Sequence, residues 1–253
     1  IVVINSGSTI DLQWAENEDK VKAILFAYQG GMEGGGAMGD VLVGDVSPSG
    51  RLPDTFTRNL EDYYSTSTFH ESQDYVDYTD DIYVGYRYFT TIPGEEDKIL
   101  YPFGYGLSYT SFSIKTKSYL VKDNTVFLSL DIMNTGDYKA KDVIEIYLKA
   151  PDGLALQRPK RVLAAFAKTP LLNPGESCTT DISFPLRDTA SFDDKGVVKD
   201  RTWVLEKGKY SILITDDAQT FIEKELEITR DIVYETSPTV LSSPLLTERL
   251  SGA

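Results

Sequence analysis

The stretch VFLSLDIMNTGDYKAKDVIEIYL, residues 126–148, decides the fold of the larger part of this chain. Apolar and polar residues alternate over residues 126–132, and a second apolar run follows at residues 143–148. Alternation with a period of two is typical of half-buried β-strands. Asn134 and Gly136 supply a turn signal between the two runs. The stretch therefore predicts two strands of an antiparallel sheet.

The same pattern continues towards the C-terminus. Further strands are predicted over residues 161–167, 178–184, 203–206, 209–215 and 221–228. Short strands at intervals of about 8–12 residues, with Gly and Pro turns between them, favour an antiparallel sandwich. We therefore assign residues 111–230 to an all-β sandwich of the immunoglobulin-like type. Residues 231–253 lack clear periodicity and are predicted to be a tail or linker.

The first 110 residues have a different pattern. Residues 1–5 (IVVIN) and 21–28 (VKAILFAY) are apolar on both faces, which is typical of parallel strands covered by helices. A glycine-rich turn then leads into a helix predicted near residues 37–44, with Gly44 as its C-terminal cap. Strand, turn and helix in this order predict an α/β layer. Outside this layer, Trp203 lies in one of the predicted strands of the sandwich and is expected in the sandwich core.

The α/β layer is expected to be incomplete. The chain opens inside an apparent strand, with no Met and no basic segment of a signal peptide. We therefore expect the chain to be a piece of a longer protein, and we predict no cellular location for it.

A long aromatic loop, residues 58–90, is the first candidate for function. Seven of the 16 tyrosines lie between Tyr63 and Tyr88, and residues 58–82 show no regular pattern. Loops of this length are usually functional or packed on another domain. Aromatic rings also stack on the apolar faces of sugars. His70, Tyr75 and Tyr78 are the candidate substrate-binding residues. The alternative for each is a solvated loop residue or one packed on a neighbouring domain.

Loop carboxylates are the second candidate. Glu33, Asp54, Asp80 and Asp81 are the acids expected nearest to a cleft. Glycoside hydrolysis uses two carboxyl groups, about 5–5.5 Å apart for retention or about 6.5–9.5 Å for inversion. The alternative is a structural role in turn caps or salt bridges, with arginines at 51 and 87 as natural partners.

Composition excludes several classes of function. The net charge of −14 repels phosphate backbones, so nucleic-acid binding is not expected. No apolar run approaches the roughly 18 residues of a membrane span, so no membrane association is expected. A single cysteine, Cys178, and a single histidine predict neither a disulfide framework nor a metal centre. The glycine-rich turn lacks the spacing of a nucleotide-binding motif, so a structural turn is expected there, with a ligand site as the alternative.

Several runs resemble the family 3 glycoside hydrolases, the β-glucosidase and β-xylosidase group. They are GGMEGGGAMGDVLVGDVSPSGRLPDTF (residues 30–56), DIYVGYRYF (81–89) and YPFGYGLSY (101–109). RPKRVLAAF (158–166), NPGES (173–177) and residues 203–214 are similar to the fibronectin type III-like domain that follows in many of these enzymes. The resemblance covers about residues 1–228. Met32 departs from it, because the family usually has glutamine there.

The resemblance implies a fold and a function. Residues 1–110 would be the second half of an α/β-sandwich domain, and residues 111–230 a fibronectin type III-like β-sandwich. The whole enzyme would be a retaining, exo-acting β-glucosidase-like hydrolase of β-glucosides or oligosaccharides, without metal or cofactor. Its nucleophile, an aspartate, lies in a separate barrel, and its acid/base glutamate lies upstream of the segment matching residues 1–5. No catalytic residue is therefore assigned to this chain, and the fragment alone is expected to be inactive.

The missing barrel and the missing first half of the α/β domain are the protein partners that the resemblance implies. The barrel precedes this segment in some members of the family and follows it in others. The rival hypothesis is a non-catalytic carbohydrate-binding or adhesion module that uses the β-sandwich, because the chain carries no visible catalytic pair.

Overall fold

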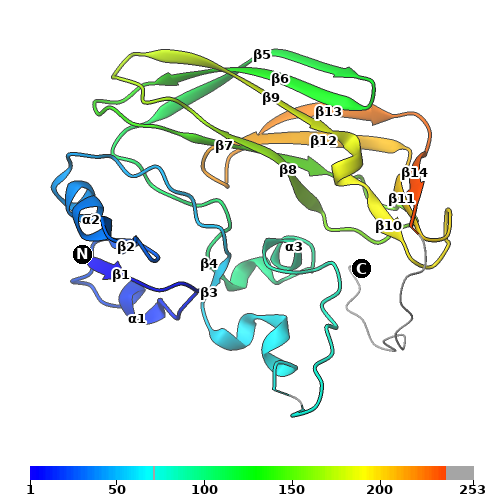
Figure 1. Ribbon diagram of the computed structural model, residues 1–253, viewed down its shortest axis with the longest axis horizontal. Coiled ribbons are helices and arrows are strands. Elements are labelled where there is room, and N and C mark those ends of the chain that lie inside the picture. Colours follow the sequence, from blue (N-terminus) through cyan, green and yellow to red (C-terminus); the bar gives the residue numbers. More distant parts are fainter. Residues whose placement is uncertain (71, 238–253) are drawn as a thin grey trace.

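The computed structural model of the protein describes residues 1–70 and 72–237. A β-sandwich makes up the larger part, and a smaller α/β part lies against one of its sides (Figure 1). None of the helices within these residues is long and apolar enough to cross a membrane.

Two antiparallel sheets form the sandwich. The first has the order β5–β6–β9, with β5 at Phe112–Lys122, β6 at Thr125–Asn134 and β9 at Ser177–Pro185. The second has the order β13–β12–β7–β8, with strands at Ile222–Ile228, Gly208–Thr215, Val143–Lys149 and Arg161–Lys168. The strands predicted within these bounds are confirmed.

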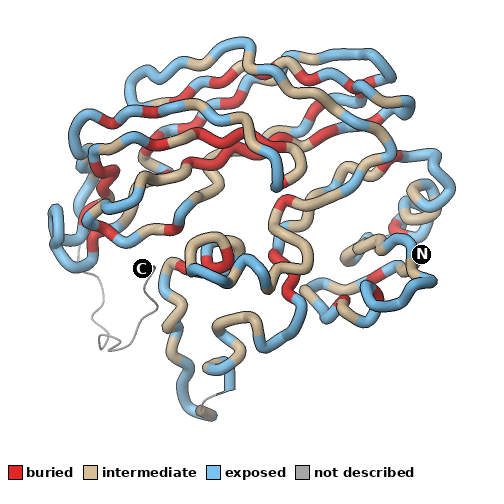
Figure 2. The backbone as a smooth tube through the Cα atoms, turned by 180° about the vertical axis from the view of Figure 1, so that it is seen from behind, coloured by how far each residue is buried: buried red, intermediate tan, exposed pale blue. Residues whose placement is uncertain are grey.

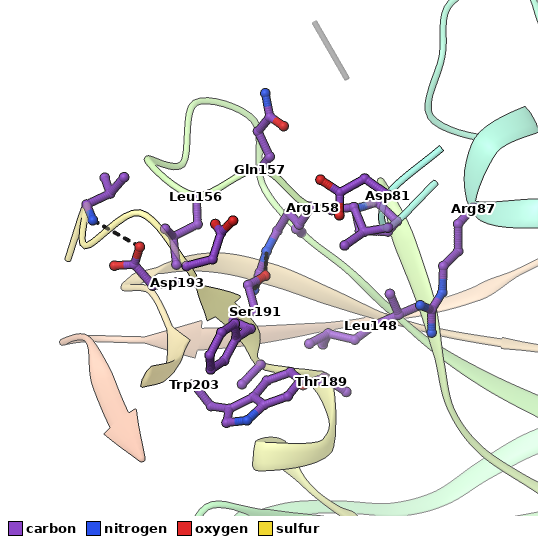
Figure 3. A pocket seen from close by; sticks show the side chains of 18 of the residues that line it. Asp81, Arg87, Leu148, Leu156, Gln157, Arg158, Thr189, Ser191, Asp193 and Trp203 are labelled. Atoms are coloured by element: carbon purple, nitrogen blue, oxygen red, sulfur yellow. Dashed lines mark hydrogen bonds between the residues drawn. The ribbon is translucent and has the colours of Figure 1, made fainter. Parts of the chain in front are cut away.

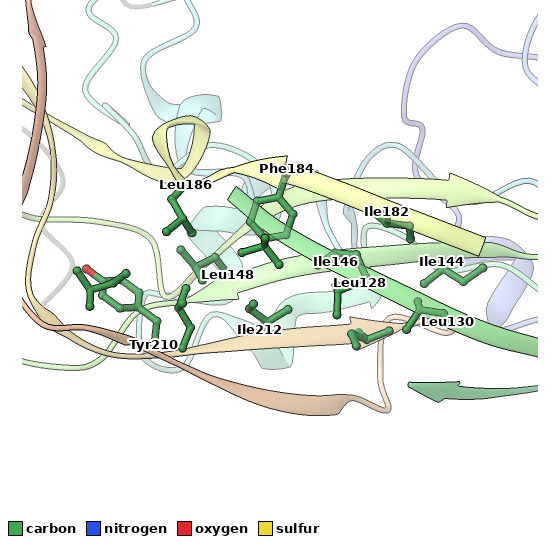
Figure 4. Close-up of a cluster of buried hydrophobic side chains, with 14 of the residues drawn as sticks. Leu128, Leu130, Ile144, Ile146, Leu148, Ile182, Phe184, Leu186, Tyr210 and Ile212 are labelled. Carbon is green, nitrogen blue, oxygen red and sulfur yellow. The ribbon is translucent and has the colours of Figure 1, made fainter. Parts of the chain in front are cut away.

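The sandwich core follows from the alternation in β6. Leu128, Leu130 and Ile132 are almost completely buried and face Ile146 of β7 and Ile212 of β12 (Figure 4). The intervening Phe127 is 43% exposed, because it points to the outer face of the sheet. Strand β7 is buried on both faces, since its outer face is covered by the α/β part. That double burial is why β7 lacks strict alternation in the sequence.

A third, smaller sheet closes one end of the sandwich. Its order is β10–β11–β14, with β10 at Ser191–Asp193, β11 at Thr202–Leu205 and β14 at Ile232–Thr236. A 3₁₀ helix, η4 at Leu186–Thr189, leads from β9 into β10. The prediction of a tail from residue 231 is therefore wrong for β14. This strand is short and mostly exposed, so its two half-buried residues give a weak period-two signal. Residues 238–253 of the predicted tail lie outside the described residues.

The α/β part is built on one parallel strand pair. Strands β1 (Val2–Ile4) and β2 (Ile24–Phe26) pair in parallel, as the two apolar runs predicted. A short helix, α1, lies between them at Gln13–Glu16, and α2 follows at Gly34–Val43. Helix α2 begins three residues earlier than predicted and ends at Gly44, whose φ of 86° confirms the predicted glycine cap.

Much apolar surface of the α/β part is uncovered. Its core is small and centred on Ile4, Leu12 and Phe56, whereas Val3 and Trp14 are exposed. Figure 2 shows the contrast, with buried residues concentrated in the sandwich strands. A second small pair, β3 (Phe56–Thr57) with β4 (Ile99–Tyr101), completes this part.

The aromatic loop is partly ordered into helical turns. Two 3₁₀ helices, η1 (Leu60–Asp62) and η2 (Tyr64–Ser67), occupy its first half, and helix α3 (Tyr86–Phe89) closes it. A third, η3 (Glu96–Lys98), precedes β4. The absence of pattern predicted for residues 58–82 is wrong at η1 and η2. The Asn59 backbone N–H donates to the Asp62 carboxylate at 2.9 Å and so caps η1.

The two parts meet along β7 and β8, and we call this contact the joint. Arg51 forms a 2.8 Å ion pair with the buried Asp142. The Tyr86 hydroxyl accepts a hydrogen bond from the backbone N–H of Leu163 at 2.8 Å. The joint places α3 and the aromatic loop against one side of the sandwich.

Candidate functional site

A small cavity of about 210 Å³ lies beside the aromatic loop, and we call it the aromatic cavity. Thr9, which follows β1, lines it together with Asp54, Thr55 and Asp80. Its other lining residues are Tyr63, Tyr64, Ser65, Tyr83, Val84, Gly85, Tyr88 and Phe89. Ligands of open α/β sheets bind beyond the carboxyl ends of parallel strands. The aromatic cavity borders the segment that leaves the carboxyl end of β1, so its position fits that rule.

Aromatic rings of the loop pack on one another and hold the wall of this cavity. Tyr83, Tyr88 and Phe89 form a buried cluster, and Tyr63 and Tyr64 pack against it. The Tyr63 hydroxyl also donates to the backbone oxygen of Thr55 at 2.7 Å. Most of the tyrosine-rich loop therefore packs on itself and forms a small separate core. The wall is fixed by packing rather than by regular strands.

Two buried hydroxyl groups of the α/β part have unused hydrogen-bonding capacity, and one of them lines the cavity. The side-chain oxygens of Thr55 and Tyr28 are both buried and have no hydrogen-bond partner among the described residues. Thr55 is only 3% exposed and lines the cavity directly. A buried hydroxyl without a partner costs about 1–3 kcal/mol. A hydroxyl-bearing ligand in the aromatic cavity would remove that cost at Thr55.

Two phenols, Tyr28 and Tyr88, have pKa values above the ordinary value and therefore stay protonated at neutral pH. Burial raises the pKa of Tyr28 above its ordinary value, and the negative charge of Asp54 raises it further. Burial also raises the pKa of Tyr88, with a hydrogen bond to Glu95 as the next cause. Tyr28 also has a φ of 51°, an unusual conformation for a non-glycine residue. These groups can therefore act as hydrogen-bond donors, but not as bases.

The structure separates the four candidate loop carboxylates. Asp54 and Asp80 line the aromatic cavity, whereas Asp81 lines a larger cavity described below. Glu33 sits at the N-cap of α2 and lines neither. Arg51 pairs with Asp142 of the sandwich, so it does not serve as the predicted partner of a loop carboxylate.

A larger cavity of about 780 Å³ lies between the aromatic loop and the sandwich, and we call it the junction cavity (Figure 3). The loop contributes Asp81 and Arg87, and the sandwich contributes Arg158, Ser191 and Trp203. Trp203 was expected in the sandwich core, but it is only half-buried. Thr202 and Val204 on either side of it are buried inward, so Trp203 faces the cavity.

The three predicted substrate-binding residues do not come together at one site. Tyr78 is 76% exposed and lines the junction cavity. Tyr75 is 61% exposed, and exposed His70 contacts the ring of Phe69 at a centroid distance of 4.5 Å. Neither lines the aromatic cavity or the junction cavity. Their substrate-binding roles stay predictions.

Sequence reasoning missed Thr55 as a lining residue. It lies in the PDTF run, where the two neighbouring strand residues Phe56 and Thr57 are also buried. A lone threonine in such a run gives no signal of an unpartnered hydroxyl. Over residues 1–70 and 72–237, no group of three or more His, Cys, Asp or Glu residues is placed to hold a metal ion.

Comparison with known families accounts for most of the chain. Residues 1–109 match the family described as Glycosyl hydrolase family 3 C-terminal domain. Residues 142–218 match the family described as Fibronectin type III-like domain. The two matches follow one another in the same order as the α/β part and the sandwich.

Relatives named as beta-glucosidases match the chain over most of its length. The chain is 42% identical to Beta-glucosidase A of Butyrivibrio fibrisolvens over 99% of its own length and 32% of that protein. It is 39% identical to a beta-glucosidase of Ruminococcus albus over 87% of its length and 23% of that protein. The chain thus spans a third or less of the length of these relatives.

Solved structures show the same fold. A beta-glucosidase from Paenibacillus barengoltzii superposes with a TM-score of 0.87 at 39% identity, over 93% of this chain and 26% of that one. Beta-glucosidase 3B from Thermotoga neapolitana, solved in complex with alpha-D-glucose, superposes with a TM-score of 0.82 at 36% identity. That match covers 92% of this chain and 32% of the other.

Proposed function

Because the chain belongs to glycosyl hydrolase family 3, of which it carries the C-terminal domain and a fibronectin type III-like domain, we propose that it is part of a β-glucosidase-like enzyme. That enzyme is retaining and exo-acting, and it removes terminal β-linked sugar residues from oligosaccharides. The observation that carries the proposal is the match of both parts, in order, to proteins named as beta-glucosidases.

In our proposal, the two reacting carboxyl groups of this retaining hydrolase lie in polypeptide other than residues 1–253, as the resemblance to the family implies. One carboxylate attacks the anomeric carbon, and a second carboxyl group protonates the leaving oxygen and then activates water. In our proposal the barrel supplies the nucleophile, and the first half of the α/β domain supplies the acid/base. The uncovered apolar residues Val3 and Trp14 support docking of that first half on β1 and α1.

This chain, in our proposal, supplies part of the wall of the sugar cleft. The aromatic cavity supports that role, because it combines tyrosine rings with Asp54, Asp80 and the unpartnered hydroxyl of Thr55. Apolar rings and hydroxyl-binding side chains are the combination that a pyranose requires, since its two faces carry C–H groups and its edge carries hydroxyls.

The first test concerns the isolated chain. We expect residues 1–253 to hydrolyse no aryl β-glucoside above the buffer rate, measured by release of the aryl alcohol. If the chain hydrolyses the substrate, and Asp54→Asn or Asp80→Asn abolishes that activity, the catalytic carboxylates lie in this chain. That result would overturn the assignment of the reacting groups to other polypeptide.

The second test restores the missing parts. In a chimera, residues 1–253 replace the corresponding third of Beta-glucosidase A of Butyrivibrio fibrisolvens. We expect the chimera to hydrolyse the aryl β-glucoside, and Asp54→Asn or Asp80→Asn to raise KM several-fold. Glu33→Gln is the matched control, because this loop carboxylate lines neither cavity. Equal KM values for all three variants would remove the aromatic cavity from the sugar cleft.

A non-catalytic carbohydrate-binding role is the second candidate. The observation that favours it is the junction cavity, because most of its lining residues come from the β-sandwich. This role does not depend on hydrolysis, so it is testable on the chain alone.

A further inference from the structure

The junction cavity has the size of a ligand site. Its volume of about 780 Å³ falls within the roughly 300–1,000 Å³ of small-molecule sites, which occur preferentially where two domains meet. The cavity lies between two groups of segments (Figure 3). One is α3 with the adjoining loop. The other is the segment that precedes β8 together with the segments of β10 and β11. No step of the proposed hydrolysis uses it.

One side of the cavity is apolar and aromatic. Phe192 is 38% exposed, and its ring centroid lies 5.3 Å from that of Trp203. Arg187 lies over the Trp203 ring at 6.0 Å, which helps to fix the ring. Leu148 and Leu156 are buried and also line the cavity, with Leu156 on the side of Asp193 and Leu148 on the side of Arg87 (Figure 3). An apolar ligand face therefore finds rigid rings and aliphatic groups to pack against.

Next to the rings, the cavity presents a planar polar group held in place by Ser191, the neighbour of Phe192 in β10. The Arg158 guanidinium donates to the Ser191 hydroxyl at 2.7 Å and to the Tyr210 hydroxyl at 3.0 Å. It also lies over the Tyr210 ring at 5.6 Å. A side chain immobilised before binding loses little entropy when a ligand arrives. Arg87 and Tyr78 reach the same cavity from the aromatic loop.

The charge of the lining favours a neutral ligand. Four aspartates and three cationic side chains line the cavity, although the whole chain carries a net charge of −14. Asp193, one of the four, is buried, and backbone N–H groups of residues 197–199 donate to its carboxylate at 2.6–2.9 Å. These hydrogen bonds hold Asp193 ionised, so the lining carries one more negative charge than positive charges. A neutral ligand is therefore favoured over an anionic one.

We propose that the junction cavity binds a neutral oligosaccharide of hexopyranose units, with the sugar faces on Phe192 and Trp203 and the hydroxyl groups on the Arg158 and Arg87 side. A chain of pyranose units offers apolar faces to the aromatic rings and hydroxyl groups to the arginines, whereas a charged ligand does not. This binding is independent of hydrolysis, because it needs only the loop and the sandwich of this chain.

The test uses Trp203 as a reporter. The chain has two tryptophans, and Trp14 lies in the α/β part outside the cavity. In a Trp14→Phe chain of residues 1–253, all tryptophan fluorescence comes from Trp203. We expect titration with cellotriose to change this fluorescence saturably, with a Kd in the order of 0.1–1 mM, and calorimetry to give the same Kd.

Matched variants locate the binding. Phe192→Ala is expected to weaken binding about tenfold, because it removes a ring from the apolar wall. Phe127→Ala is the control. Phe127 is similarly exposed, on the outer face of the β5–β6–β9 sheet, and it lines no part of this cavity. Arg87→Ala is the second variant, because this exposed side chain can be removed without disturbing the packing. It is expected to weaken binding several-fold.

Three results overturn the proposal. One is the absence of any fluorescence or calorimetric response to cellotriose up to about 20 mM, well above the expected Kd. Another is an unchanged Kd in folded Phe192→Ala and Arg87→Ala chains. The third is loss of binding in Asp54→Asn, which moves the saccharide to the aromatic cavity. Failure of the chimera to hydrolyse an aryl β-glucoside leaves this binding measurement unaffected, so the two proposals fail separately.

Discussion

Gly104 shows how one residue fits the two parts together. It has a φ of 83°, and a Cβ at this position would lie 2.3 Å from a carboxylate oxygen of Glu145 on β7. Glu145 is itself buried and accepts a hydrogen bond from the Tyr147 hydroxyl at 2.7 Å. The glycine therefore leaves room for a buried carboxylate of the sandwich at the joint.

We predict that Gly104→Ala destabilises the chain by about 2–4 kcal/mol, because a side chain adds a clash to the backbone strain. Gly153→Ala is the matched control. Gly153 has a similar φ of 77°, but nothing lies within 4 Å of a Cβ there, so its cost is only about 1 kcal/mol. Urea unfolding of both variants measures the difference. Equal losses would show that Glu145 moves aside freely.

A second prediction at this scale concerns pH. Burial raises the pKa of Asp142 from 3.8 to about 6, with Asp216 adding to the rise and Arg51 opposing it. The folded state therefore holds this proton more tightly than the unfolded state. The resulting stabilisation is complete below about pH 4 and is lost as pH rises through about 6. We expect the free energy of unfolding to fall by an amount on the order of 2 kcal/mol between pH 5 and pH 8.

Asp142→Asn provides the control for that measurement. Asparagine keeps an oxygen for Arg51 but does not titrate, so the slope with pH should flatten. The carboxyl groups of Asp193 and Asp217, whose pKa values are lowered, are ionised in both states above pH 5 and contribute nothing in this window. A free energy of unfolding that rises with pH, or an equal slope in the variant, contradicts the prediction.

Single residues also mark what the sequence does not reveal. Arg51 was a natural partner for a nearby acid, yet it pairs with a residue 91 positions away. Ion pairs of this kind depend on how two domains dock, and no local pattern encodes docking. Gly44, in contrast, was predicted correctly because a helix end is a local event that glycine alone accommodates well.

At the scale of elements, alternation was a reliable guide where one face of a strand is buried. Strands β6 and β13 were predicted from it because the sandwich core takes every second residue. Strand β14 was missed because it is an edge strand of five residues with no fully buried member. The turns η1 and η2 of the aromatic loop were missed for a different reason, since side-chain packing and a capped turn order them without any period.

The missed strand gives a prediction. A chain that ends at Arg230 lacks β14, and with it Ile232 and Tyr234, which pack against the sandwich core. It also lacks the ion pair between Arg187 and Glu235. We expect a loss of about 2–4 kcal/mol in the free energy of unfolding relative to a chain that ends at Ser237. Equal stability of the two truncated chains would show that β14 adds nothing to the sandwich.

At the scale of the whole molecule, burial is divided unevenly. The sandwich holds one continuous core of 17 buried residues, whereas the cluster around Ile4 has three. Both folds were predictable from the sequence, because two periodicities and a set of motifs mark them. The candidate sites were not, because each cavity draws on segments far apart in the chain.

This unevenness predicts the pattern of hydrogen exchange. In the isolated chain, backbone amides of residues 1–57 should exchange at least tenfold faster than those of β6 and β7. The reason is that local opening exposes little buried surface in the α/β part. Mass spectrometry of peptides from both parts measures the rates, and the sandwich strands serve as the internal reference. Uniformly slow exchange would mean that residues 1–57 are stable without further polypeptide.

The joint described above has an evolutionary consequence. Several of its hydrogen bonds join a side chain on one part to a backbone group on the other, as Tyr86 does with Leu163, Thr91 with Lys160 and Lys168 with Ser49. A peptide group is the same whatever residue carries it. Mutations can therefore accumulate on the backbone side without breaking these bonds. Positions 160 and 163 of the sandwich and position 49 of the α/β part are thus free to diverge between lineages, while Tyr86, Thr91 and Lys168 keep the two parts together.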